Sequence, residues 1–174
     1  MKINKILFIA TLFVAVTSNA QIEKGNWMMG GSAGLSNYES KSVGFSQEGT
    51  NIYISPNVGY FLIDKLNLGA SALLSFYNPG ATKTYGISPY VRYYFLEKEK
   101  QINLFSEVGY GFQKQIHSST TLQTFNLKAG TVIFLNSSVG LEVALNYTNS
   151  KQNSDFQTRL IFLGIGFQIH LEKE

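Results

Sequence analysis

A strict two-residue alternation near the C-terminus constrains the fold more than any other feature of this chain. From position 161 onward the odd positions carry large apolar side chains: Ile161, Leu163, Ile165, Phe167, Ile169 and Leu171. The even positions from 164 carry small or polar ones: Gly164, Gly166, Gln168 and His170. Successive side chains of a β-strand point to opposite faces, so this segment has one apolar face and one small or polar face. Such a strand fits a sheet with lipid outside and a narrow polar interior.

The N-terminus has the pattern of a secretory signal peptide. Two lysines, Lys2 and Lys5, precede the segment Ile6–Val16, which is apolar except for one Thr, and small residues follow at Ser18–Ala20. This order predicts export with cleavage after Ala20. The apolar run is too short to cross a bilayer as a helix, which needs about twenty residues. We therefore expect residues 1–20 to be removed and residues 21–174 to form one domain.

Composition excludes several classes of protein. The chain has no Cys, which excludes disulfides, lipid attachment through cysteine and a Cys-ligated metal site. Without residues 1–20, 12 basic residues face 11 acidic ones, so nothing suggests a nucleic-acid partner. No later stretch is apolar enough for a transmembrane helix. The predicted destinations are the periplasm, the medium or the outer membrane.

The alternation recurs along the chain and predicts eight strands. They lie near 25–36, 51–63, 66–77, 82–95, 102–115, 121–135, 139–150 and 157–171. These segments are long for a soluble protein but suit tilted membrane strands. Tight polar turns alternate with longer loops rich in Ser, Thr, Asn and Gln, the longest at 37–50. The expected fold is all-β: an eight-stranded antiparallel up-and-down transmembrane β-barrel, with its tight turns and both termini in the periplasm.

Aromatic residues on the predicted apolar faces gather near the strand ends. One group is Trp27, Tyr60, Tyr93, Phe95 and Phe167, and the other is Phe76, Tyr85, Tyr110, Phe112, Phe125 and Tyr147. Membrane–water interfaces select two such girdles because amphipathic rings rest at the depth of the lipid headgroups. The alternation therefore predicts a bilayer around the barrel.

Three segments carry a resemblance to a known family. Asn51–Gly69, Ser88–Phe95 and Leu104–Gly111 resemble hairpins of small outer-membrane β-barrels, the OmpX-like and OmpA transmembrane-domain-like proteins often described as porin-family barrels. The resemblance covers essentially all of residues 21–174. It implies a monomer in the cell outer membrane, assembled from the periplasm with chaperones and the barrel-assembly machinery, and it implies no cofactor. The family's last strand typically ends in an aromatic residue, whereas this chain continues past Phe167, so recognition by that machinery would use Phe167 or a less conventional signal.

Four charged residues fall on the predicted inner face: Arg92, Glu107, Lys128 and Glu142. Pairing Phe95 with Leu104 sets Arg92 directly opposite Glu107, and we expect these two to form an internal ion pair. Lys128 and Glu142 are less well aligned with each other in the predicted strands, but we expect them to play the same structural role. Eight strands leave room only for their own side chains, so we interpret the four charges as a polar plug and not as an ion path.

His117 and Ser119 are weak candidates for catalysis. A His two residues before a Ser at the outer rim is similar to the site of outer-membrane lipid A deacylases, although a Ser/Thr-rich loop meets this spacing easily. His170 is predicted to be an inward-facing, hydrogen-bonded residue. With two His in the whole chain, no histidine-based metal site is expected.

Three functional classes fit these observations. The first, which we favour, is a non-catalytic outer-membrane barrel with a polar, plugged lumen that contributes to envelope integrity or presents surface loops to a partner. The second is a lipid-modifying enzyme in the same barrel. The third is a secreted lipocalin-like carrier, which has an apolar interior and a wet exterior. The alternation alone does not separate the first from the third, but the number of large apolar groups overfills so small a cavity.

Overall fold

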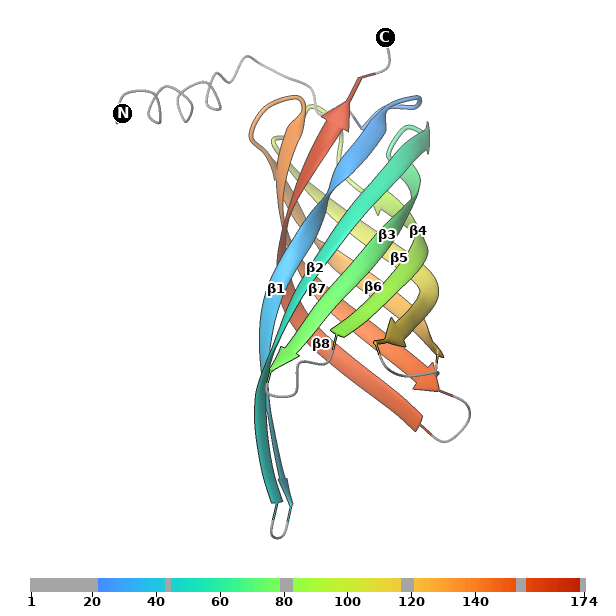
Figure 1. The fold of residues 1–174 in the computed structure, drawn as a ribbon. Helices are drawn as coiled ribbons and strands as arrows, with labels where there is room; N and C mark the ends of the chain where they lie inside the picture. The colour runs from blue at the N-terminus through green and yellow to red at the C-terminus, as the bar shows by residue number, and fades with distance from the viewer. Residues whose placement is uncertain (1–21, 43–44, 79–82, 117–120, 153–155, 173–174) are drawn as a thin grey trace, which may run out of the picture.

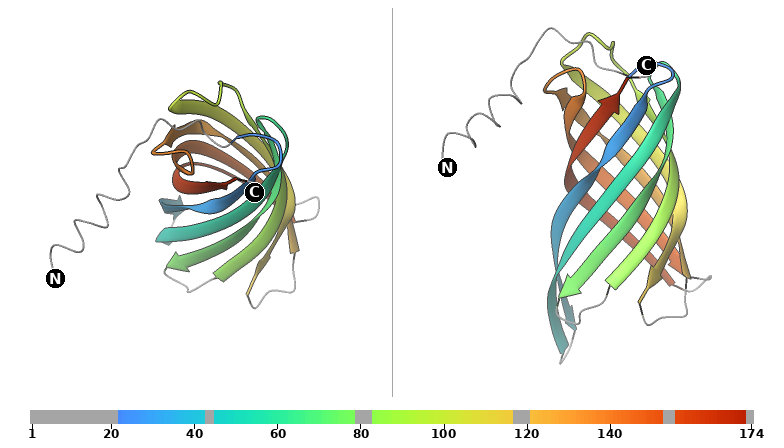
Figure 2. Two further views of the ribbon diagram at one scale, coloured as in Figure 1. Left: turned by 90° about the horizontal axis from the view of Figure 1, so that it is seen from above. Right: turned by 45° about the horizontal axis from the view of Figure 1, so that its top comes forward.

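The computed structural model describes residues 22–42, 45–78, 83–116, 121–152 and 156–172. Eight strands follow one another: β1 (Trp27–Ser42), β2 (Phe45–Ile63), β3 (Leu66–Asn78), β4 (Lys83–Tyr94), β5 (Ile102–Gln115), β6 (Thr121–Phe134), β7 (Val139–Gln152) and β8 (Phe156–Leu171). Each strand pairs antiparallel with the next, and β8 pairs with β1, which closes the barrel. The strands tilt around a common axis and form a ring (Figure 1, Figure 2). The predicted up-and-down barrel is confirmed.

The barrel has two distinct ends. We call the end with the tight turns around residues 64–65, 95–101 and 135–138 the turn end, and the opposite end the loop end. The first and last described residues both lie at the turn end (Figure 1). No helix among the described residues is long and apolar enough to cross a bilayer.

The first hairpin differs from the sequence prediction. Residues 37–50 were expected to form a loop, but β1 continues to Ser42 and β2 begins at Phe45, and the two stay paired along this whole stretch. The prediction was wrong because it equated polar composition with a loop. A two-stranded ribbon is held by backbone hydrogen bonds, which need no apolar face.

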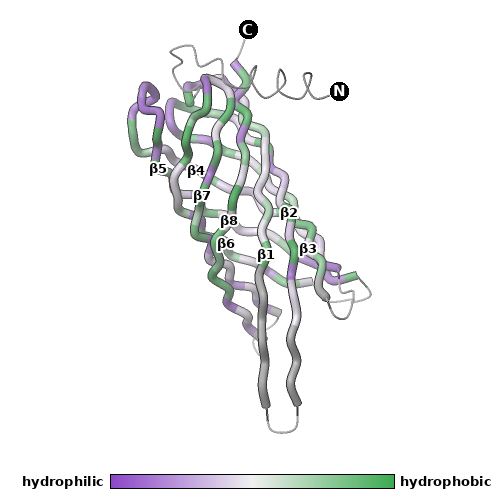
Figure 3. Tube along the Cα trace, turned by 90° about the vertical axis from the view of Figure 1, so that its left-hand side faces the viewer, coloured by the Kyte–Doolittle hydropathy of each residue, from purple (hydrophilic) through white to green (hydrophobic). Residues whose placement is uncertain are grey.

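The outer side of the barrel wall is apolar, and the interior holds the buried charged and polar side chains together with a cluster of buried apolar ones. Leu163 is 63% exposed, whereas Arg92 is fully buried in the interior. Hydrophobic and hydrophilic residues alternate along the strands (Figure 3). A soluble lipocalin-like carrier needs the opposite arrangement, so the orientation of these side chains contradicts that alternative.

The predicted aromatic girdles lie on the outer surface. At the turn end Trp27 packs edge-on against Tyr60 on β2, with 5.2 Å between ring centroids. Towards the loop end Tyr110 and Phe112 of β5 make a similar contact at 6.2 Å. Each of these rings except that of Tyr60, which is partly buried, is about half exposed. Exposed rings at both ends of the wall match a barrel that meets two membrane–water interfaces.

Candidate functional site

The interior contains three layers, which we describe from the turn end towards the loop end: an aromatic cluster, an ion network and a cavity. Each layer is built from inward-facing residues of several strands. The alternation that makes the outer wall apolar therefore also brings these side chains together, because every second residue must point to the axis.

The aromatic cluster fills the turn end. It consists of the buried residues Ile22, Met28, Phe61, Tyr90, Tyr94, Phe105, Val132, Phe134 and Ala144. The imidazole ring of His170, which is fully buried, stacks on Phe61 at 5.8 Å and meets Phe134 edge-on at 5.4 Å. The backbone N–H of His170 donates to the Ser138 carbonyl (2.6 Å). The structure thus places His170 inside the turn end, among rings.

A short N-terminal strap, residues 22–26, closes this end. The side chain of Ile22 is 1% exposed and belongs to the aromatic cluster. Backbone hydrogen bonds tie the strap to the β2–β3 hairpin: Gly25 N–H donates to Phe61 O (2.9 Å), and Lys65 N–H donates to Ile22 O (2.9 Å). Lys65 has a positive φ of 68°, which turns its N–H towards the strap. Sequence analysis missed this strap because residues 22–26 show no alternation of apolar and polar residues.

Two exposed ion pairs hold the strap and turns from outside. Lys98 contacts Glu23 of the strap, and Lys65 donates to Glu97 (2.6 Å). The hydrogen bond to Glu23 raises the pKa of Lys98 above its ordinary value, and the bond to Glu97 does the same for the pKa of Lys65. These pairs are solvated, so salt weakens them.

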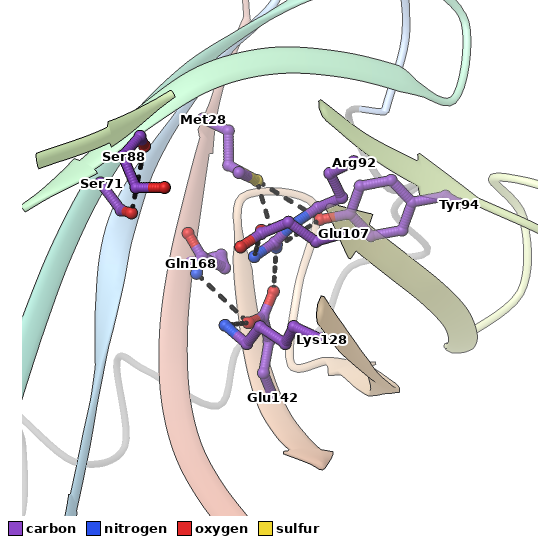
Figure 4. A network of polar contacts seen from close by, with 9 residues as sticks. All are labelled: Met28, Ser71, Ser88, Arg92, Tyr94, Glu107, Lys128, Glu142 and Gln168. Atoms are coloured by element: carbon purple, nitrogen blue, oxygen red, sulfur yellow. Dashed lines mark hydrogen bonds and ion pairs between the residues drawn. The ribbon is translucent and has the colours of Figure 1, made fainter. Parts of the chain in front are cut away.

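The ion network lies inside the barrel next to the aromatic cluster, and Figure 4 shows its residues. Arg92 on β4 lies opposite Glu107 on β5 in the strand register, as the sequence-based pairing has it. Its guanidinium donates from Nε to Glu107 Oε2 at 2.8 Å, and Nη2 lies 2.6 Å from the same oxygen. The same guanidinium also contacts Glu142 on β7 through Nη1.

Glu142 is the centre of this network. Its carboxylate accepts from Arg92, from Lys128 Nζ (3.3 Å) and from Gln168 Nε2 (3.3 Å), and its side chain is 1% exposed. The four charges sum to zero. Such a balance is required of charges buried in a low-dielectric interior.

Aromatic faces complete the surroundings of the cations. The Arg92 guanidinium lies 4.5 Å from the centroid of the Phe105 ring, and Nη1 donates to the Tyr94 hydroxyl (3.2 Å). The Lys128 ammonium lies 5.7 Å from the same Phe105 ring. Sequence reasoning missed Phe105, Tyr94 and Gln168, although their inward parity was a usable signal.

A cavity of about 350 Å³ lies between the ion network and the loop end. Glu107, Lys128 and Tyr90 form its floor, and its walls carry many hydroxyl and amide groups: Ser32, Asn51, Ser55, Asn57, Ser71, Ser75, Thr84, Ser88, Gln113, Thr124, Asn126, Asn146, Thr148, Ser150 and Thr158. The hydroxyls of Tyr53 and Tyr90 and the Asn57 carbonyl oxygen are buried without a hydrogen-bond partner among the described residues. From the sequence we expected the strands' own side chains to take up all the room in the lumen. This cavity shows that the expectation was wrong towards the loop end.

The two residues that the sequence analysis considered for catalysis are not part of the described structure. His117 and Ser119 lie outside the described residues. Within the described part of the chain, no group of three His, Asp or Glu side chains is close enough to hold a metal ion.

Known structures share this fold. The N-terminal β-barrel domain of OprF from Pseudomonas aeruginosa matches with a TM-score of 0.62 and 13% identity, over 85% of this chain and 98% of that chain. Neisserial surface protein A matches with a TM-score of 0.61 and 18% identity, over 84% and 97%. The outer membrane protein OprG from Pseudomonas aeruginosa matches with a TM-score of 0.58 and 14% identity, over 89% and 100%. No protein-family model and no curated protein matches the sequence. The chain therefore has the fold of small outer-membrane β-barrels.

Proposed function

From this fold, we propose that the protein is a non-catalytic integral outer-membrane β-barrel whose lumen is closed at the turn end. It spans the membrane as a monomer, contributes to envelope integrity, and presents its loop end and the β1–β2 hairpin to the outside. The turn end faces the periplasm. This orientation follows from a chain exported by a cleaved signal peptide and assembled from the periplasm by the barrel-assembly machinery and its chaperones.

One observation supports membrane insertion above the others: large apolar side chains cover the outer wall while a neutral ion network fills the inside. Leu163 and Ile161 on β8 are 63% and 65% exposed, and Arg92 and Glu142 are 0% and 1% exposed. In water this arrangement would expose a continuous apolar surface far larger than soluble monomers carry. A bilayer accepts that surface without cost.

The closed lumen is supported by the two inner layers at the turn end. Aromatic rings and the strap fill the interior below the ion network, and the network itself joins β4, β5, β6, β7 and β8. At the turn end the side chains of an eight-stranded barrel are enough to fill its narrow interior. We therefore expect no aqueous path from the cavity to the turn end.

Two measurements test the proposal. Fractionation of cells producing the full chain should place the mature protein in the outer membrane, beginning at Gln21. Reconstitution into planar bilayers should give no stepwise ion conductance. Recovery from the soluble periplasm, or stable conducting steps, would overturn the location or the closed lumen respectively.

The proposal that the protein is not an enzyme is tested separately. Purified protein and the Ser119→Ala variant should both leave lipid A intact in a hydrolysis assay. Deacylation that disappears in the Ser119→Ala variant would show that the protein is an enzyme of the second class. Membrane location and conductance would not be affected by that result.

A further inference from the structure

The pairing between β1 and β8 stops half way along the barrel. The two strands are in register from Trp27–Leu171 to Ala33–Ile165. Beyond this point β8 pairs with β7 as far as Phe156, and β1 pairs with β2 as far as Ser42, but no β1–β8 pair follows among the described residues. β1 runs straight on with β2 while β8 follows the opposite wall (Figure 1). We call this place the β1–β8 gap.

The surroundings of Gly166 and Gly164 on β8 also show where the pairing with β1 ends. A Cβ built on Gly166, in the paired region, would meet the Gly31 carbonyl oxygen of β1 at 2.7 Å. A Cβ on Gly164, one strand step further, would instead meet the Tyr53 hydroxyl at 2.6 Å and the Asn146 amide at 2.9 Å, with no β1 atom within 3.9 Å. Next to Gly164, therefore, the nearest atoms belong to the side chains of Tyr53 and Asn146 and not to the backbone of β1.

Tyr53 and Phe162 lie on the inner side of the gap. The Tyr53 side chain, on β2, lies over both Gly34 of β1 and Gly164 of β8, and its ring meets Phe162 edge-on at 4.9 Å. Both rings line the cavity. The Tyr53 hydroxyl is buried and has no hydrogen-bond partner among the described residues. A buried hydroxyl without a partner is unfavourable, so a ligand that supplies one is favoured.

The outer side of the gap is apolar. Leu35 on β1 and Ile161 and Leu163 on β8 flank it, with exposed fractions of 61%, 65% and 63%, the highest among the large apolar side chains of the described residues. Unpaired strand edges facing hydrocarbon are costly unless polar atoms reach them. The gap thus lies between an apolar outer surface and a cavity whose walls carry both apolar side chains and many hydroxyl and amide groups.

We propose that the cavity binds the head of a single-chain amphiphile with a neutral, polyhydroxylated headgroup, and that its acyl chain leaves through the β1–β8 gap past Tyr53 and Phe162. The volume of about 350 Å³ corresponds to roughly a dozen water molecules at ~30 Å³ each, enough for a glycerol or one sugar ring. A neutral head is favoured because the two charged groups in the lining, Glu107 and Lys128, are already paired. This inference rests on the proposed membrane location and goes beyond the proposed role.

Equilibrium binding tests the ligand. The mature protein in phosphatidylcholine nanodiscs should bind radiolabelled 1-monopalmitoylglycerol saturably, with about one molecule per barrel after subtraction of empty discs. Tyr53→Phe should weaken binding about tenfold, because it removes only a hydroxyl that the fold leaves unpaired. Tyr60→Phe, on the outer wall, is the matched control and should bind like the wild type. Absence of saturable binding, or equal binding by the Tyr53→Phe variant, would overturn the proposal.

Two further ligands test the chemistry. Palmitate has the chain with an anionic head, and glycerol has the head without a chain, so both should bind at least tenfold more weakly than the monoglyceride. Equal affinity for palmitate would contradict the neutral head, and equal affinity for glycerol would contradict the route through the gap.

Cross-linking tests the gap itself, since the natural chain contains no Cys. Ala33→Cys with Ile165→Cys joins the last registered pair and should form a disulfide on oxidation. Leu35→Cys with Leu163→Cys, two residues further and on the same face, should not. Equal cross-linking of both pairs would mean that the gap is closed in the membrane, which would overturn the proposal. Heat-modifiability and flotation of the same samples report insertion, so inserted protein that fails to bind contradicts this inference alone.

Discussion

Arg92 and Glu142 contact each other across the lumen from β4 and β7, two strands that are not neighbours in the wall. The pair therefore links two parts of the wall that no backbone hydrogen bond connects. Arg92 Nη1 and Nη2 reach Glu142 and Glu107 respectively, and Glu142 is shared with Lys128. The stability of the barrel should therefore depend more on the Arg92–Glu142 contact than on the contact between Arg92 and Glu107.

Glu142→Gln should lower the free energy of unfolding by about 3–5 kcal/mol, because it leaves a buried network with a net positive charge. Glu107→Gln should cost less, about 1–3 kcal/mol, because Glu107 borders the cavity and its side chain is 15% exposed. Urea unfolding in lipid vesicles measures both. Equal losses would mean that Glu142 is not the centre of the network.

Removal of both Arg92 and Glu142 should be less harmful than removal of Glu142 alone. Glu107 and Lys128 face each other in the β5–β6 register, so in the Arg92→Met, Glu142→Leu double variant they remain as a neutral pair. The double variant should unfold at higher urea than Glu142→Leu. A double variant that is weaker than Glu142→Leu would contradict this account of charge balance.

A charge on the outer wall should be costly in proportion to its depth. Leu163→Lys, in the middle of β8, should destabilise the barrel by about 2–4 kcal/mol in a bilayer, whereas Leu171→Lys at the turn end should cost about 0–1 kcal/mol. Both residues lie on the same face of the same strand. Folding into lipid vesicles gives the comparison, and equal costs would place the bilayer elsewhere on the wall.

Because β4 and β5 approach each other closely, adding a methyl group at Gly86 should lower the stability of the barrel more than adding one at Gly109. A Cβ on Gly86 would lie 2.7 Å from the Phe112 carbonyl oxygen, which is backbone and cannot rotate away. A Cβ on Gly109 would lie 3.0 Å from Ser88 Oγ, which can rotate, and 3.1 Å from the Pro89 carbonyl oxygen, which needs to shift less than the Phe112 oxygen does. Gly86→Ala should cost about 1–3 kcal/mol in urea unfolding, and Gly109→Ala clearly less.

The exposed strap pair gives a pH-dependent prediction. The raised pKa of Lys98 keeps its amine protonated, so the ion pair with Glu23 is complete below the ordinary lysine value of 10.5 and is lost as the pH rises through the raised value. Only the neutral amine reacts with acylating reagents. Glu23→Gln should therefore speed acylation of Lys98 at about pH 10, measured by mass spectrometry. Lys65, whose partner is Glu97, is the internal control and should not change.

The fold could be predicted from the sequence because a period of two fixes both faces of every strand at once. The direct pairing of Arg92 with Glu107 also followed, since a short turn sets the register of the hairpin around it. Contacts across the lumen between strands that are not neighbours could not be predicted from the register of a single hairpin. The Arg92–Glu142 contact depends on how the tilted strands are staggered around the ring, which no single hairpin reveals.

The cavity and the β1–β8 gap were hidden from the sequence for a related reason. Tyr53 and Phe162 are inward residues of two strands that are not neighbours. Their rings meet where the pairing of β1 with β8 has ended, after Ala33. Alternation says which way a side chain points but not how long two neighbouring strands remain paired. Strand pairing across the chain ends is set by closure of the whole barrel.

The ribbon formed by β1 and β2 beyond Ala33 also determines what meets the molecule first. Beyond the last described β2–β3 pair, Thr50–Asn78, the two strands pair with each other from Tyr38–Gly49 to Ser42–Phe45, and five extended residues advance roughly 16 Å at ~3.3 Å per residue. An antibody or any other large particle that approaches the loop end therefore meets this paired part of β1 and β2 before it reaches the rim (Figure 1). The standoff between such a particle and the lipid surface is set by the length of one hairpin.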